Sequence, residues 1–144
     1  MTATTINQTG GRSPFIQTDV SSEDSVRDLV ANLVEYMDGI DIVVNDAGAF
    51  VFGSIKDATI ASGMKAFGVN VVGAAKVVKH CLGALKKSKS PSIVNIASIS
   101  SFIAQPDSLP YNASKCALQQ MTKCHAMDLG HLNIRVNCIS PGDI

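Results

Sequence analysis

The sequence lacks a net charge, because its twelve lysine and arginine residues balance its twelve aspartate and glutamate residues. A neutral chain has no long-range field that would attract nucleic acid or an anionic membrane. It also lacks an apolar run of membrane-spanning length, since Lys76, Lys79 and His80 interrupt its most apolar stretch, residues 69–85. The first residues contain no apolar core of a secretory signal. The composition, 46% hydrophobic and 17% charged, therefore predicts one globular cytoplasmic domain over residues 1–144.

Paired cysteines are also missing. The four cysteines, Cys81, Cys116, Cys124 and Cys138, form no CxxC pair and have no metal-ligand spacing. His125 beside Cys124 is a single neighbour on an expected helix, which does not make a ligand set. We therefore expect no metal site, and free, mostly buried thiols in a reducing compartment.

The third missing feature is a glycine-rich phosphate-binding loop. Gly10 and Gly11 in "TGG" follow no apolar strand, and no further glycines follow at the spacing of such a loop. They stand directly before the short apolar segment "SPFIQTDV". We interpret the two glycines as the turn that ends a helix.

What the sequence does contain is an alternation of strand-like and helical segments. Short β-branched runs predict strands at residues 14–20, 40–45, 92–97 and 133–140. Helices are expected from a capping box at Ser21 and Asp24 to Met37, closed by Gly39, then over Ser62–Leu85 and Leu109–Leu129. Such alternation favours parallel pairing through right-handed crossovers. The expected fold is α/β, a three-layer, doubly wound (Rossmann-like) parallel sheet.

In such sheets, ligands bind outside the carboxyl ends of the strands. Small, polar or turn-forming residues follow all four expected strands: Asp19 and Val20, Asn45 to Gly48, Ser98, and Pro141 with Gly142. The strand ends alone therefore favour a binding site at this edge.

The segment "YNASK" places a phenol, Tyr111, and an ammonium group, Lys115, on one face of an expected helix. Free tyrosine is too weak an acid to serve as a base at neutral pH, but a fixed positive charge favours its phenolate. Ser98 ends the preceding strand, and the chain returns through Pro106 to the helix, so the two hydroxyls can converge. This arrangement suits general acid–base catalysis on an alcohol, which becomes hydride transfer when a nicotinamide is present. By itself, however, YxxxK is a short and common pattern.

Six segments together resemble the short-chain dehydrogenase/reductase family in order and spacing. They are "DV" at 19–20, "NDAG" at 45–48, "VNVVG" at 69–73, "IVNIAS" ending at Ser98, "YNASK" at 111–115 and "RVNCISPG" at 135–142. They cover nearly the whole chain from Ser13. One position departs from the family pattern: Asp46 stands where the family usually has asparagine, and a carboxylate cannot donate the hydrogen bonds of an amide.

The resemblance implies a role for each matching residue. Tyr111 would be the general acid/base, Lys115 would favour its phenolate and bind the nicotinamide ribose, Ser98 would orient the substrate oxygen, and Asn70 would hold a proton-relay water. Cofactor contacts would come from Asp19 and Val20 at the adenine ring, from Asn45, Ala47 and Gly48, and from Pro141 and Gly142 near the nicotinamide. The implied activity is NAD- or NADP-dependent interconversion of a small-molecule alcohol and a ketone or aldehyde.

The same resemblance implies missing parts: the family's first strand, its glycine-rich loop, its second strand and the substrate region after Pro-Gly. NAD and NADP cannot be distinguished, because the deciding residue ends that second strand, and the substrate is equally open. In the family's strand order, 3-2-1-4-5-6-7, two strands separate residues 15–20 from residues 40–45. The strand at 15–20 is therefore expected to be an orphan or to re-pair, and residues 1–144 alone are expected neither to bind dinucleotide tightly nor to turn over substrate.

Two alternatives remain open. A truncated family member could act without catalysis as a binding or interaction module, and a glycine-rich loop encoded upstream would argue against this. A nucleotide-sugar epimerase or dehydratase shares YxxxK, but "NDAG" and "SPG" favour the dehydrogenase. The resemblance also implies a homo-oligomer, dimer or tetramer, through the helices at 62–85 and 109–129, where Val72 and Val77 add apolar positions outside the inward set.

Overall fold

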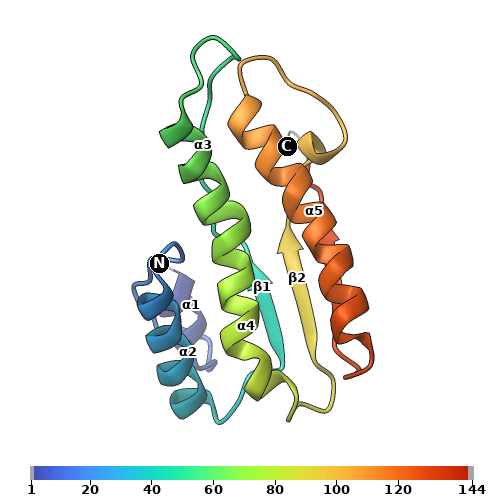
Figure 1. The fold of residues 1–144 in the computed structure, drawn as a ribbon. Helices are drawn as coiled ribbons and strands as arrows, with labels where there is room; N and C mark the ends of the chain where they lie inside the picture. The colour runs from blue at the N-terminus through green and yellow to red at the C-terminus, as the bar shows by residue number, and fades with distance from the viewer. Residues whose placement is uncertain (1, 143–144) are drawn as a thin grey trace.

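A computed structural model describes residues 2–142 (Figure 1). Three strands, β1 (Ile42–Asn45), β2 (Ser92–Ile96) and β3 (Arg135–Ile139), form a parallel sheet in the order β1-β2-β3. The helices are α1 (Thr2–Gln8), α2 (Glu23–Met37), α3 (Ile60–Phe67), α4 (Ala74–Leu85) and α5 (Leu109–Gly130). The expected α/β class and parallel pairing are confirmed.

The core lies between one face of the sheet and helices α4 and α5, which lie across that face in Figure 1. One residue from each strand contributes to this core with side chains of both helices: Val43, Ile93 and Val136 with Val78, Leu85 and Leu129. Because successive strand residues point to opposite faces, Ile42, Val44 and Ile139 point the other way, and each is more than half exposed. Within residues 2–142, helices therefore cover one face of the expected doubly wound sheet.

Helix α2 begins one residue later than the sequence suggests. Ser22, not Ser21, is its N-cap, and the Ser22 hydroxyl accepts a hydrogen bond from the backbone N–H of Ser25. Ser21 instead donates its hydroxyl to the carboxylate of Asp19. At the other end, Asp38 adopts the left-handed conformation at φ 62°, directly before Gly39.

The long helix expected over Ser62–Leu85 is present, but its middle is a π-helical turn rather than α-helix. Helix α3 starts earlier, at Ile60, where Thr59 and Ser62 form a capping box. A π-helical turn over Gly68–Gly73 then separates α3 from α4. Such turns add a residue to the helical repeat and are frequent at functional sites. Apolar periodicity does not reveal this turn: Met64 of α3 has the inward spacing but is 67% exposed, whereas Val78 of α4 is buried as the spacing predicts.

The strand expected at residues 14–20 is also wrong. The segment is part of no strand, and Figure 1 shows it away from the sheet, near α1 and α2. Of the two outcomes expected for it, the orphan is the one observed, since a strand needs a neighbour for its backbone groups. The interpretation of "TGG" is confirmed, because Gly10 has φ 88° and the N–H of Gly11 bonds to the carbonyl of Ile6 at the end of α1.

Gly73 is a point of close approach between the π-helical turn and the orphan segment. A Cβ atom at this position would lie 2.9 Å from Val20 Cγ2 and 3.1 Å from the Val20 carbonyl oxygen. We expect Gly73→Ala to lower the free energy of unfolding by about 1–3 kcal/mol, since backbone must shift to relieve the overlap. Gly83→Ala in α4 is the control: a Cβ there meets no atom within 4 Å, so alanine should stabilise by about 0.5–1 kcal/mol. Urea unfolding measures both, and equal effects of the two substitutions would show that Val20 does not pack against Gly73.

The cysteines are less buried than expected. Only Cys81 is buried, while Cys116 and Cys124 are exposed and Cys138 is intermediate. Burial raises the pKa of the Cys81 thiol to about 11. We expect a short pulse of iodoacetamide near neutral pH to alkylate Cys124 and to spare Cys81, because the thiolate is the reactive form. Peptide mass spectrometry measures the alkylation of each cysteine, and the same pulse in urea should label both Cys81 and Cys124. Equal labelling of the two in the folded protein would contradict the burial of Cys81.

Candidate active site

A cleft of about 660 Å³ lies at the carboxyl edge of the sheet, where the segments after β1, β2 and β3 meet the first turns of α5. The predicted site residues that line it are Gly48, Ser98, Tyr111, Lys115, Pro141 and Gly142. Backbone hydrogen bonds extend the β2–β3 pairing beyond the strands, from Ala97 N–H to the Ile139 carbonyl and from Ile99 N–H to the Pro141 carbonyl, both 2.8 Å. These bonds hold the Pro-Gly segment beside Ser98.

Tyr111 and Lys115 lie together in this cleft, as their spacing predicts. The Lys115 ammonium nitrogen is 5.8 Å from the centroid of the Tyr111 ring. The same ring is stacked on Phe50, at a centroid separation of 4.8 Å. Within residues 2–142, the Tyr111 hydroxyl forms no hydrogen bond, so it is available to a ligand in the cleft.

Lys115 is a buried cation with spare donors. Its Nζ donates one hydrogen bond, to the carbonyl of Ile96 at 2.7 Å, and an ammonium group can make two more. Burial lowers the pKa of Lys115, and the carboxylate of Asp46 in the same cleft opposes this effect. Asp46 therefore helps to keep a positive charge beside Tyr111.

Asn70 is placed behind the cleft rather than in its lining. Its side chain is 1% exposed, and the π-helical turn directs it to the loop after β1, where its Oδ1 accepts from Ala49 N–H at 2.6 Å. Its Nδ2 donates to the carbonyl of Ala49 and to Ser114 Oγ of α5. Asn70 thus ties the strand-end loop to the helix that carries Tyr111 and Lys115.

The remaining predicted contacts lie outside the cleft lining. Asn45 donates to Asn95 across the β1–β2 pair at 2.8 Å, and the Asp19 carboxylate accepts from Ser21. Val20 lies against Gly73, and Ala47 is exposed on the strand-end loop. Their cofactor contacts stay predictions.

Among the cleft residues that sequence reasoning missed, three contact the predicted site residues or each other. Phe50 stacks on Tyr111, and Ser100 and Gln105 form a hydrogen-bonded pair next to Ser98. All three lie in irregular or 3₁₀ segments between elements, where no periodic apolar pattern indicates which way a side chain points. Their only signal is proximity in sequence to Gly48 and Ser98.

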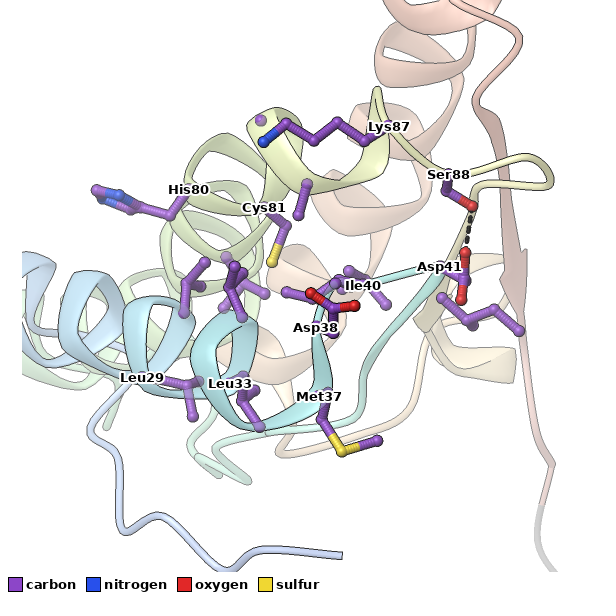
Figure 2. Close-up of a pocket in the computed structure, with 18 of the residues that line it drawn as sticks. Leu29, Leu33, Met37, Asp38, Ile40, Asp41, His80, Cys81, Lys87 and Ser88 are labelled. Atoms are coloured by element: carbon purple, nitrogen blue, oxygen red, sulfur yellow. Dashed lines mark hydrogen bonds between the residues drawn. The ribbon is translucent and has the colours of Figure 1, made fainter. Parts of the chain in front are cut away.

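A second cavity, of about 1000 Å³, lies between α2, α4 and β1 (Figure 2). Leu29, Leu33 and Met37 of α2 line it together with Cys81 of α4. Two of its polar side chains are already paired: Ser88 with Asp41, drawn as a dashed line in Figure 2, and His80 with Glu23 at 2.7 Å. It is an apolar groove beside β1, without a buried cation and a free hydroxyl, so the smaller cleft is the candidate site.

Comparison with known proteins identifies the family. A family model described as enoyl-(acyl carrier protein) reductase matches residues 1–144. A solved putative short-chain alcohol dehydrogenase from Sinorhizobium meliloti superimposes with a TM-score of 0.92 at 30% identity, over 98% of this chain and 56% of that one. The chain belongs to the short-chain dehydrogenase/reductase family.

Two further relatives of this family show what the chain is similar to. L-fucose dehydrogenase from Rattus norvegicus is 38% identical over 131 residues, which is 90% of this chain and 48% of that protein. NAD⁺-bound xylitol dehydrogenase superimposes with a TM-score of 0.92 at 31% identity, over 97% of this chain and 54% of that one. The chain thus spans about half the length of the curated relatives it matches.

In the described part of this short-chain dehydrogenase/reductase chain, no helix is long and apolar enough to cross a membrane. The same residues contain no group of three or more histidine, cysteine, aspartate or glutamate side chains that could hold a metal ion.

Proposed function

We propose that residues 1–144 form the catalytic half of an NAD- or NADP-dependent oxidoreductase that interconverts a small-molecule alcohol and a ketone or aldehyde. The observation that carries this proposal is the cleft in which the ring of Tyr111, whose hydroxyl is free within residues 2–142, lies 5.8 Å from the buried ammonium of Lys115. Because the relatives are about twice as long, the activity is proposed for a domain of their length that contains these residues.

The proposed roles follow from what each side chain can donate or accept. Tyr111 moves the proton to or from the substrate oxygen, as a general acid or base. Lys115 supplies a nearby positive charge, which favours the phenolate of Tyr111. Ser98 orients the substrate oxygen from the end of β2, and Asn70 holds the strand-end loop against α5 and organises a relay water.

The cleft fits the nicotinamide end of a dinucleotide. Lys115 has two unused donors for ribose hydroxyls, and the wall between strand ends is formed by Gly48, Pro141 and Gly142, which present little side chain. The cofactor, when bound, supplies the hydride donor or acceptor at a carbon next to the substrate oxygen. Asp19, Val20, Asn45 and Ala47 are proposed to contact the rest of the dinucleotide; the choice between NAD and NADP stays open.

The direct test is an assay of the full-length domain with NAD⁺ and NADP⁺ and a panel of alcohols. L-fucose and xylitol are suitable first probes, because relatives of this chain are named for these substrates. Reduced-cofactor absorbance should increase with at least one alcohol and one cofactor. Cofactor binding without turnover of any alcohol or carbonyl compound would instead favour the non-catalytic binding module.

We also propose a cytoplasmic homo-oligomer. Free, exposed thiols such as Cys124 suit a reducing compartment. Met64 of α3 and Met127 of α5 are 67% and 84% exposed, so the helix layer presents apolar side chains that a second copy would cover. Val77, in contrast, packs against the core, while Val72 is 47% exposed. Light scattering of the full-length domain distinguishes dimer or tetramer from monomer.

A further inference from the structure

The hydroxyl hydrogen of Ser98 is already in use. Ser98 Oγ donates to Ser100 Oγ at 3.1 Å and accepts from the backbone N–H of Ser100 at 3.1 Å. Ser100 Oγ in turn donates to Gln105 Oε1 at 2.7 Å. Since a serine hydroxyl has one hydrogen and two lone pairs, Ser98 can offer a ligand only its remaining lone pair in this arrangement.

This direction of the hydrogen bonds suits one oxidation state of the substrate. An alcohol can donate its hydroxyl hydrogen to the free lone pair of Ser98. A carbonyl oxygen can only accept, so it needs the hydrogen that Ser98 gives to Ser100. The proposed reaction has both an alcohol and a carbonyl compound at the same place.

Gln105 can reverse the chain of hydrogen bonds because its amide has a donor end and an acceptor end. If the amide turns end for end, its Nε2 donates to Ser100, Ser100 donates to Ser98, and the Ser98 hydrogen is free for the ligand. The two serines need to turn only their hydroxyl hydrogens. Their surroundings are fixed: Ser98 and Ser100 are 8% and 2% exposed, and the backbone carbonyl of Gln105 accepts from Asn112 Nδ2 at 3.1 Å.

We propose that Ser98, Ser100 and Gln105 form a reversible hydroxyl relay, in which Gln105 is the positioning residue that decides whether Ser98 donates to a carbonyl or accepts from an alcohol. The inference rests on the proposed function, because it takes Ser98 as the residue that orients the substrate oxygen. It adds two residues, Ser100 and Gln105, whose substitution should change how Ser98 binds each form of the substrate.

Gln105→Glu in the full-length domain distinguishes the two hydrogen-bonding states of Ser98, donor and acceptor. An ionised carboxylate only accepts, so it locks the relay with Ser98 as acceptor. The carbonyl compound then loses one hydrogen bond from Ser98, and kcat/KM for its reduction should fall about tenfold near pH 7. Below the pKa of the introduced carboxyl group, its O–H can donate, and kcat/KM should return towards that of the unsubstituted enzyme. Gln105→Met, similar in length but apolar, should lose activity without this recovery.

The control variant is Gln17→Glu, which adds the same carboxyl group at an exposed position outside the cleft. Asp46, Tyr111 and Lys115 line the cleft, and Cys116 of α5 contacts the Ser101 carbonyl. These titratable groups are present in every variant. Dividing the kcat/KM of each variant by that of the unsubstituted enzyme at the same pH therefore removes their contribution. If this kcat/KM ratio for Gln105→Glu does not change with pH, or if it matches the ratio for Gln17→Glu, the relay is wrong. The proposed oxidoreductase function would not be affected by that result.

A second measurement does not depend on turnover. With ¹³C-labelled glutamate, the pKa of the introduced carboxyl group of Gln105→Glu can be measured directly, and Ser100 should lower this pKa because it donates to the ionised form. Adding Ser100→Ala should remove this lowering, and Gln17→Glu should show none. A carboxyl group that titrates alike with and without Ser100 would refute the relay, even if no alcohol had been found to react.

Discussion

Tyr111→Phe is expected to remove nearly all hydride-transfer activity of the full-length domain and to leave cofactor affinity largely unchanged. The substitution deletes only the hydroxyl oxygen, which forms no hydrogen bond within residues 2–142, and keeps the ring that stacks on Phe50. Loss of a general acid/base costs about 100- to 10,000-fold in rate. Steady-state kcat and a cofactor titration of the same preparation measure the two quantities separately.

Lys115→Ala is the informative comparison. Lys115 is proposed both to hold the ribose and to favour the phenolate, so this variant should lose cofactor affinity and rate together. Its removal also leaves the Ile96 carbonyl without its donor, and thermal unfolding should be measured to separate that effect. A Tyr111→Phe enzyme that keeps a tenth of its activity would exclude Tyr111 as the acid/base.

The strands and helices whose apolar residues recur at regular spacing were predictable from the sequence. Strands β1, β2 and β3 and helix α5 lie within a few residues of their expected bounds, because β-branched runs and caps mark them locally. The π-helical turn around Asn70 was not predictable, since it depends on how the helix meets the loop at Ala49. The segment at 14–20 has the composition of a strand. A strand forms only when it is hydrogen-bonded to a neighbouring strand, and the composition of one segment does not show whether such a neighbour exists.

The candidate site also has residues that could be predicted from the sequence and residues that could not. Tyr111, Lys115 and Ser98 could be placed together because each follows or begins a recognisable element. Phe50 and Gln105 could not, because their positions depend on loops whose path is set by tertiary contacts, such as the bridge between Gly53 and Ser108. Asn45 ends a strand as a ligand contact would, and its side chain also bonds Asn95 on the neighbouring strand, so its proposed cofactor contact stays a prediction.

A polypeptide of residues 1–144 alone is expected neither to bind NADH or NADPH tightly nor to turn over an alcohol. The cleft offers a ribose site at Lys115, but among its lining residues there is no glycine-rich turn at a helix N-terminus to neutralise a pyrophosphate. In the described residues, β1 pairs only with β2, and Ile42 and Val44 beside its free edge are 63% and 58% exposed. Free apolar edges of this kind favour association, which competes with an ordered binding surface.

Thermal shift and cofactor fluorescence at saturating NADH and NADPH test this expectation. The chain contains no tryptophan, so cofactor emission can be followed without energy transfer from that residue. The full-length domain serves as the positive control, and its melting temperature should rise with its cofactor. A cooperative melt of residues 1–144 that shifts upward with either nucleotide would contradict the expectation. It would also show that the strand ends at Gly48, Ser98 and Pro141, with Lys115, hold a dinucleotide without a phosphate loop.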